Sequence, residues 1–186
     1  MDGEIVNRVA QSGLITFDLA DHYDAGERVT LDIKDQLFHG MLLREKDFRA
    51  YVKEQNWSEY DGKHVQITCS ADAIVPVWAY MLLATRLEPF AATLVFGSTH
   101  DLETEIFKKS LDKIDFQEFD GKKIVVKGCG DIDVPTSIYV ELTRRLRPYA
   151  SKIMYGEACS SVPLYKKPRE KSAAGGNRPK RRPVIK

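Results

Sequence analysis

Apolar residues follow two periodicities along the chain, and each predicts one kind of secondary structure. Four short runs rich in β-branched and other apolar residues are predicted strands: residues 14–19, 28–33, 64–68 and 123–127. Residues 44–55 instead place Phe48, Tyr51 and Val52 on one face at helical spacing, which predicts an amphipathic helix. A shorter amphipathic helix is predicted over residues 1–12.

From residue 44 onward the pattern repeats with an offset of about 59 residues. Residues 57–63, WSEYDGK, correspond to residues 116–122, FQEFDGK, aromatic for aromatic and turn for turn. The residues that follow recur at the same spacings, as Pro76 and Pro135, Tyr80 and Tyr139, and Gly97 and Gly156. A register kept across a whole unit predicts an internal duplication, with units at about 44–100 and 103–159.

Each repeated unit has the pattern of a helix, a strand, a cysteine-containing loop, a second helix and a second strand. Pro76 and Pro135 mark helix starts, because proline is favoured at the first helical position. Pro89 and Pro148 mark where those helices end. Strands that alternate with helices predict an α/β sandwich, a mainly parallel sheet covered by helices.

The predicted helix after the first cysteine is apolar on every side over residues 77–84. A helix without a polar face is either deeply buried or part of a subunit interface. A homodimer is therefore one expectation for this chain.

Three cysteines stand near predicted strand ends. Cys69 and Cys129 each end an apolar run and precede a helix-starting proline, and residues 159–163, CSSVP, read as a shortened third copy. His100 occupies the position of the first unit that is equivalent to Cys159. Because the carboxyl ends of parallel strands share one edge, where ligands usually bind, these four groups are the candidate site.

Three thiolates and one imidazole suit zinc or an iron–sulfur cluster, since soft thiolates select those metals. The aspartates of the same loops, Asp72, Asp131 and Asp133, are candidate outer ligands or hydrogen-bond acceptors. Two alternatives remain. One cysteine could be a low-pKa nucleophile or persulfide carrier of a sulfur-transfer enzyme, or all three could be inert residues of a non-catalytic interaction domain. Whether the protein is an enzyme stays open.

Length and charge favour one globular domain with a distinct terminus. The 186 residues are 43% hydrophobic and carry a net charge of +1, but nine Lys and Arg fall within residues 166–186. We therefore expect one α/β domain over residues 1–166 and a basic, disordered tail over 167–186. This tail lacks interleaved aromatic residues, so nucleic-acid binding is not expected. Without a signal-like start or an apolar run of ~18 residues, the expected location is cytoplasmic, away from membranes.

Several of these stretches together resemble one family of small bacterial proteins described only as a domain of unknown function. The resemblance covers residues 4–166 and is most specific at residues 68–76, TCSADAIVP, with further matches at 44–48, 127–129 and 159–163. Members of that family are often encoded beside SUF-type iron–sulfur assembly components. The resemblance thus implies an accessory role in which those components are partners, and it favours the metal and sulfur hypotheses.

Overall fold

The computed structural model describes residues 13–128, 130, 132–157 and 159–168. In this part of the chain the helices are α2 (Glu45–Glu54), α3 (Val77–Leu87), α4 (Thr99–Asp112) and α5 (Thr136–Leu146). The strands are β1 (Leu14–Phe17), β2 (Arg28–Asp32), β3 (His64–Thr68), β4 (Thr93–Phe96), β5 (Lys123–Val126), β6 (Lys152–Glu157) and β7 (Ser160–Lys166). Short 3-10 helices connect them: η1 (Leu19–His22), η2 (Lys34–Gln36), η3 (Trp57–Tyr60) and η4 (Phe116–Phe119).

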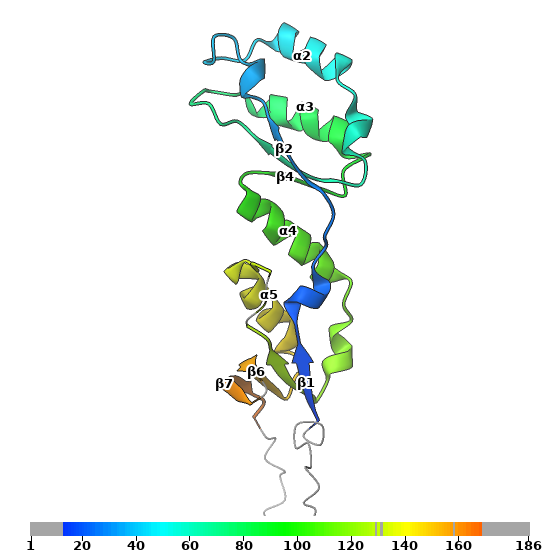
Figure 1. Cartoon of the computed structure of the whole chain (residues 1–186), viewed down its shortest axis with the longest axis vertical. Helices are drawn as coiled ribbons and strands as arrows, with labels where there is room; N and C mark the ends of the chain where they lie inside the picture. Colours follow the sequence, from blue (N-terminus) through cyan, green and yellow to red (C-terminus); the bar gives the residue numbers. More distant parts are fainter. Residues whose placement is uncertain (1–12, 129, 131, 158, 169–186) are drawn as a thin grey trace, which may run out of the picture.

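The strands form two sheets, and helix α4 lies between them in an elongated molecule (Figure 1). One sheet has the order β2-β3-β4 with every pair parallel. The other has the order β1-β5-β6-β7, in which only β7 is antiparallel. The predicted α/β class with mainly parallel strands is confirmed, but the prediction of one sheet is wrong. Strand β3 lies between β2 and β4, so β5 cannot pair with it and joins the other sheet. Hydrophobic periodicity did not reveal this, because it carries no information on strand order.

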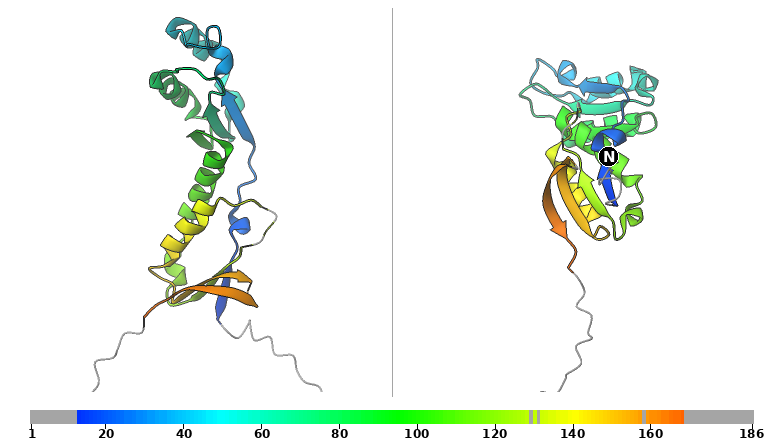
Figure 2. Two further views of the ribbon diagram at one scale, coloured as in Figure 1. Left: turned by 90° about the vertical axis from the view of Figure 1, so that its left-hand side faces the viewer. Right: turned by 60° about the horizontal axis from the view of Figure 1, so that its bottom comes forward.

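The chain path explains how two sheets arise. The chain starts in one sheet with β1, builds the whole of the other from β2 to β4, and returns through α4 to β5 (Figures 1 and 2). We call β2, α2, β3, α3 and β4 the inserted unit, and β1, β5, α5, β6 and β7 the terminal unit. Helix α4 belongs to neither and connects both.

The two units share one pairing register. In the inserted unit Arg28 pairs with His64, which pairs with Thr93. In the terminal unit Leu14 pairs with Lys123, which pairs with Lys152. Helices α3 and α5, which follow β3 and β5, have 11 residues each. The two units therefore agree in the register of their strands and in the length of these helices. That they arose by duplication stays a prediction.

Each unit has its own hydrophobic core. Helix α3 buries Ala79, Leu83 and Leu87 against the inserted sheet, and α5 buries Ile138, Leu142 and Leu146 against the terminal sheet. The outer side of α3 is open to solvent, however, because Val77 and Met81 are 72% and 64% exposed. Deep burial of this apolar helix, one of the two sequence-based explanations, is therefore wrong for the single chain.

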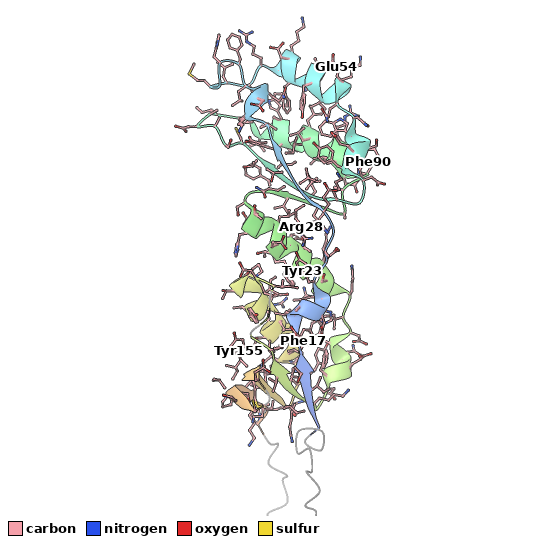
Figure 3. The ribbon with its side chains drawn as sticks, in the orientation of Figure 1. Phe17, Tyr23, Arg28, Glu54, Phe90 and Tyr155 are labelled. Atoms are coloured by element: carbon pink, nitrogen blue, oxygen red, sulfur yellow. The ribbon has the colours of Figure 1, made fainter. Side chains whose placement is uncertain are left out.

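Helix α4 packs differently on its two sides. It contributes Phe107 and Leu111 to the core of the terminal unit. Toward the inserted sheet it makes two polar contacts, in which the Thr99 hydroxyl donates to Gln66 Oε1 at 3.1 Å and Glu103 pairs with Arg28 at 2.9 Å. Leu102 and Ile106 of the same helix are buried as well. Figure 3 shows Arg28 beside Tyr23 at this junction, where the guanidinium lies 4.9 Å from the ring centroid.

Most predicted elements are found close to their expected bounds. The helix predicted over 44–55 is α2, and Pro76 and Pro135 stand one residue before α3 and α5, as N-caps. The predicted third copy at residues 159–163 is wrong, because it leads into strand β7 and not into a helix. The helix predicted over 1–12 and the tail beyond residue 168 lie outside the described residues. No helix in the described part of the chain is long and apolar enough to cross a membrane.

Candidate functional site

The carboxyl edge of the inserted sheet holds the first cysteine. Cys69 directly follows β3, is partly buried, and its thiol lies 3.8 Å from the Ala71 carbonyl oxygen. Beside it, Asp32 at the end of β2 accepts two hydrogen bonds from Ser70, from the backbone N–H at 3.1 Å and from the hydroxyl at 2.5 Å. Asp32 thus ties the end of its strand to the cysteine loop.

The charges at this edge follow from those contacts. Burial opposes ionisation of Asp32, yet the hydrogen bonds from Ser70 and the Lys34 N–H hold the pKa of this carboxyl below its ordinary value. Burial raises the pKa of the Tyr80 phenol, and the nearby Cys69 and Asp32 add to the shift. The edge of the inserted sheet therefore carries an anionic carboxylate at neutral pH.

The carboxyl edge of the terminal sheet is built on a related plan. Asp18 follows β1 and pairs with Lys127, which follows β5, at 2.6 Å. This lysine holds the pKa of the Asp18 carboxyl below its usual range, and the carboxylate raises the pKa of the lysine in turn. Asp18 also accepts from the Ala20 N–H at 2.9 Å, as Asp32 accepts from the Lys34 N–H at 3.0 Å.

Sequence reasoning missed this pair of aspartates. A signal for them was present, because Asp18-Leu-Ala-Asp21 and Asp32-Ile-Lys-Asp35 repeat one spacing, and each begins at the second-last residue of a predicted strand. This spacing stood outside the 59-residue repeat, and β1 and β2 lie before the region in which that repeat begins. The structure shows that each aspartate binds both its own 3-10 turn and a residue that follows the neighbouring strand.

Gly128 and Tyr155 join the ends of β5 and β6. The Tyr155 hydroxyl donates to the Gly128 carbonyl oxygen at 3.4 Å, and a Cβ at Gly128 would lie 2.2 Å from the tyrosine ring. Only glycine fits under this ring without a shift. Cys159, four residues after Tyr155, is exposed on the turn between β6 and β7. Cys129 and Asp131, both predicted site residues, lie outside the described residues.

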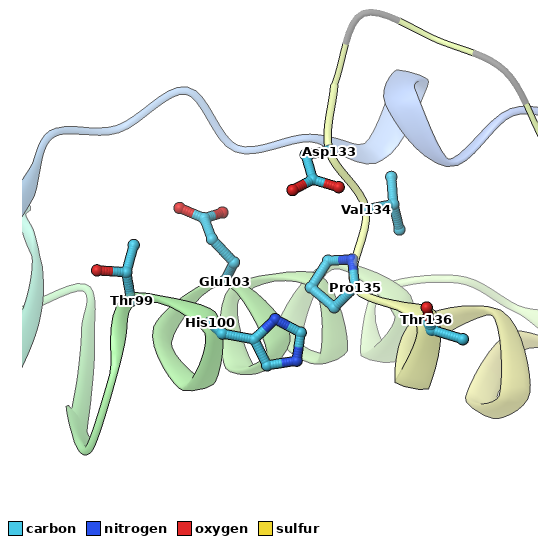
Figure 4. A pocket seen from close by; sticks show the side chains of 7 residues that line it. All are labelled: Thr99, His100, Glu103, Asp133, Val134, Pro135 and Thr136. Carbon is cyan, nitrogen blue, oxygen red and sulfur yellow. The ribbon is translucent and has the colours of Figure 1, made fainter.

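A pocket of about 280 Å³ lies between the first turn of α4 and the loop that leads into α5 (Figure 4). It is lined by Thr99, His100, Glu103, Asp133, Val134, Pro135 and Thr136. Two sequence-predicted residues thus line one pocket, His100 from the first turn of α4 and Asp133 from the loop before α5. Cys69 and Cys159 do not line this pocket.

The predicted site residues are therefore divided among three places. Cys69 is at the inserted sheet, Cys159 is at the β6–β7 turn, and His100 and Asp133 line the pocket between α4 and the loop before α5. Asp72 is exposed in the loop after Cys69. Among the residues that the structure describes, no three His, Cys, Asp or Glu side chains gather closely enough to hold a metal ion. A site that includes Cys129 stays a prediction.

Comparison with known proteins gives one match. The sequence matches the family described as "Protein of unknown function (DUF2480)" over residues 3–167. No curated protein and no solved structure matches the chain. The match spans both units and the helix between them, so the chain belongs to the DUF2480 family of proteins of unknown function.

Proposed function

We propose that this protein is an accessory factor that binds a metal or sulfur species through two thiols, Cys129 and Cys159. The observation that supports the proposal is the pairing of β5 with β6, which brings the carboxyl ends of both strands to one edge. Cys129 comes three residues after β5, and Cys159 comes two residues after β6. The hydrogen bond from Tyr155 to Gly128 fixes the chain directly before Cys129 against β6.

The surroundings of this edge leave room for a bound species. An open hollow of about 530 Å³ is lined by Gly128, Gly130, Ile132, Asp133, Val134, Tyr139 and Tyr155. Asp133 offers a carboxylate beside the loop of Cys129. Cys69 is not part of the proposed pair, because β3 belongs to the other sheet.

Two thiolates complete neither a structural zinc site nor an iron–sulfur cluster, which require about four protein ligands. The proposed site would hold zinc or an iron–sulfur species jointly with another protein, as an accessory factor in iron–sulfur assembly does. The same pair also suits sulfur transfer. One thiol would take up sulfur from a donor persulfide as its own persulfide, and attack by the other thiol on the inner sulfur would expel sulfide and leave a disulfide, which an external thiol reduces. Both uses need Cys129 and Cys159 and leave Cys69 without a role.

Metal and sulfide analysis of anaerobically purified protein tests this proposal. We expect the Cys129→Ser and Cys159→Ser variants to lose the bound metal or sulfide, while Cys69→Ser keeps it. Cys69 is a matched control, since it occupies the corresponding strand end of the other unit. Equal loss in all three variants, or no metal or sulfide above background in the wild type, would contradict the proposal.

A second candidate function is a non-catalytic interaction domain with inert cysteines. It is favoured by the apolar side chains that the inserted unit exposes: Met41, Ile74, Val77, Met81 and Phe96 are between 62% and 89% exposed. Isolated exposed apolar residues are ordinary, whereas adjoining ones mark a contact surface, and Phe96 adjoins Tyr80 on α3, one helical turn from Val77. This function and the thiol function occupy different units, so each can be tested without the other.

We also propose that the two units derive from one duplicated ancestor. The common register and the 11-residue helices α3 and α5 support a shared origin. In this view the cysteine loop was duplicated with its unit. The second thiol, Cys159, is present only in the terminal copy, and the equivalent position of the other copy is His100. A solved structure in which the two units superimpose strand for strand would support this origin, and different connections between the strands would contradict it.

A further inference from the structure

Strand β4 is an unprotected edge. It is the last strand of the inserted sheet, and within the described part of the chain it pairs only with β3. Edge strands in soluble proteins usually carry charges or proline, which prevent pairing with another chain. The edge strand β2 carries Arg28 and Asp32, and β7 carries Pro163 and Lys166. Strand β4 reads Thr-Leu-Val-Phe and carries neither feature, and the same holds for the edge strand β1, Leu-Ile-Thr-Phe.

The terminal unit shows which kind of partner strand can pair with an edge like that of β4. Strand β6 holds the position that corresponds to β4, because Lys152 pairs with Lys123 as Thr93 pairs with His64. On its outer side β6 carries an antiparallel strand, β7. Strand β4 lies beside β3 as β6 lies beside β5, so the free side of β4 corresponds to the side of β6 that pairs with β7. An antiparallel strand is therefore the partner that the geometry of β4 fits.

Apolar side chains flank the free edge. Phe96 at the end of β4 is 62% exposed, and its ring lies 4.6 Å from the ring of Tyr80 on α3. Val77 is one helical turn before Tyr80, on the same face of α3, and is 72% exposed. A partner that pairs with β4 would also cover these two side chains, and the burial of apolar surface favours association.

The charges beside β4 have opposite signs at its two ends. At the carboxyl end, Asp101 accepts from the Ser98 N–H at 2.7 Å, and the Ser98 hydrogen bonds hold the pKa of this carboxyl below its ordinary value. At the amino end, the Lys109 ammonium donates to the Ala92 carbonyl oxygen at 2.8 Å. An antiparallel copy of the same strand would bring the acidic end of each chain to the basic end of the other.

We propose that two copies of this chain pair through β4, antiparallel, about a two-fold axis beside Leu94, so that Leu94 of one copy lies opposite Leu94 of the other. This pairing joins two three-stranded sheets into one sheet of six strands. It is self-complementary, as a two-fold interface must be, because each Asp101 end meets a Lys109 end.

Sedimentation velocity of the full chain over a concentration series tests the proposal. We expect a monomer–dimer equilibrium whose dissociation constant rises at least about tenfold in Phe96→Lys, since a charge replaces an apolar contact. Val140→Lys is the matched control: Val140 is 67% exposed on α5 of the terminal unit, and its substitution should leave the equilibrium unchanged. If Phe96→Lys does not fold, as judged by circular dichroism, Val77→Lys takes its place.

Amide hydrogen exchange shows whether β4 itself is the contact. The Gly97 N–H donates to the Ile67 carbonyl oxygen on the β3 side, so alternation along the strand directs the N–H of Leu94, three residues earlier, to the free edge. We expect exchange at Leu94 to slow as the dimer forms, and to be faster again in Phe96→Lys. A monomer at every concentration, a dimer that Phe96→Lys leaves intact, or exchange at Leu94 that is independent of concentration would each overturn the proposal.

Discussion

At the scale of single residues, the terminal edge depends on a close approach that only glycine permits. The Tyr155 ring lies over Gly128, and the hydrogen bond between them ties the start of the Cys129 loop to β6. Next to this contact, Asp18 and Lys127 join the ends of β1 and β5. Three neighbouring strands are thus connected at the edge where we place the thiol site.

Gly128→Ala should displace Tyr155 and weaken this edge. An added methyl group in a packed site typically costs about 1–3 kcal/mol of unfolding free energy, and we expect a value in that range. Urea denaturation measures it. Gly130→Ala is the control, because a Cβ there would meet its nearest neighbouring atom, Ala20 Cβ, only at 4.0 Å. Equal stability of the two variants would contradict this account of Gly128.

The sequence pattern alone identifies the carboxyl ends of the strands but not the contacts made there. On the inserted sheet, for example, a cysteine after a predicted strand places Cys69 at a strand end, and the structure confirms that placement. The role of Asp18 was not predictable, because a carboxylate in a turn looks the same whether its partner is its own backbone or a lysine over a hundred residues away. Likewise, the meeting of His100 with Asp133 depends on how α4 joins two units, which no local pattern encodes.

At the scale of elements, helix α5 is held to α4 by a charged network. Glu141 binds Arg144 at 2.6 Å and Arg145 at 2.7 Å, and Arg145 in turn reaches Asp112 on α4 at 2.6 Å. The two guanidiniums lower the pKa of the Glu141 carboxyl from 4.5 to about 2. Because its folded-state pKa is depressed, Glu141 contributes stability above pH 4.5, and that contribution is lost as the pH falls toward 2.

Glu141→Gln should therefore lower stability at pH 7 by about 1 kcal/mol, a modest amount because solvent screens the pair. The variant should also lose less stability than the wild type when the pH is lowered from 4.5 to 2. Thermal unfolding as a function of pH measures both effects. Glu88→Gln, at the exposed end of α3, serves as the control. If the wild type and Glu141→Gln show parallel acid profiles, the network does not contribute in this way.

Helices and strands were predicted well where one periodicity dominates a long segment. The helix predicted over 44–55 was found as α2, because Phe48 and Val52 form one buried stripe. Strand β7 was missed, since Pro163 and the short CSSVP segment read as a loop. Pairing with β6 overrides that local preference, and as an edge strand β7 tolerates proline.

At the scale of the whole molecule, two separate hydrophobic cores are joined through α4. Arg28 with Glu103 and Gln66 with Thr99 connect the inserted sheet to α4. Two cores that share no residue are coupled less strongly than one continuous apolar core. We therefore expect the two units to open independently, each as its own cooperative segment.

Leu83→Ala and Leu142→Ala form a matched pair for that expectation. Both side chains are fully buried, on α3 and α5 respectively, at corresponding positions. Each substitution should destabilise its own unit by about 2–5 kcal/mol and leave amide protection in the other unit unchanged. Hydrogen exchange with mass spectrometry resolves the two units. Loss of protection across the whole chain in both variants would show a single cooperative molecule instead.

The sequence could not show the separation into two sheets, because the 59-residue repeat fits one sheet or two equally well. That separation decides which thiols can meet. Cys69 leaves β3 of the inserted sheet, while the chain segments that lead to Cys129 and Cys159 leave neighbouring strands of the terminal sheet. The thiol function rests on this difference between the units.

Mild oxidation followed by peptide mapping tests that difference most directly. A disulfide forms only between cysteines whose Cα atoms lie within about 7 Å, so the bond that forms reports which thiols adjoin. We expect one intramolecular disulfide, Cys129–Cys159, with Cys69 left free for alkylation. A disulfide that joins Cys69 to either of the others, or no intramolecular disulfide in the folded protein, would contradict it.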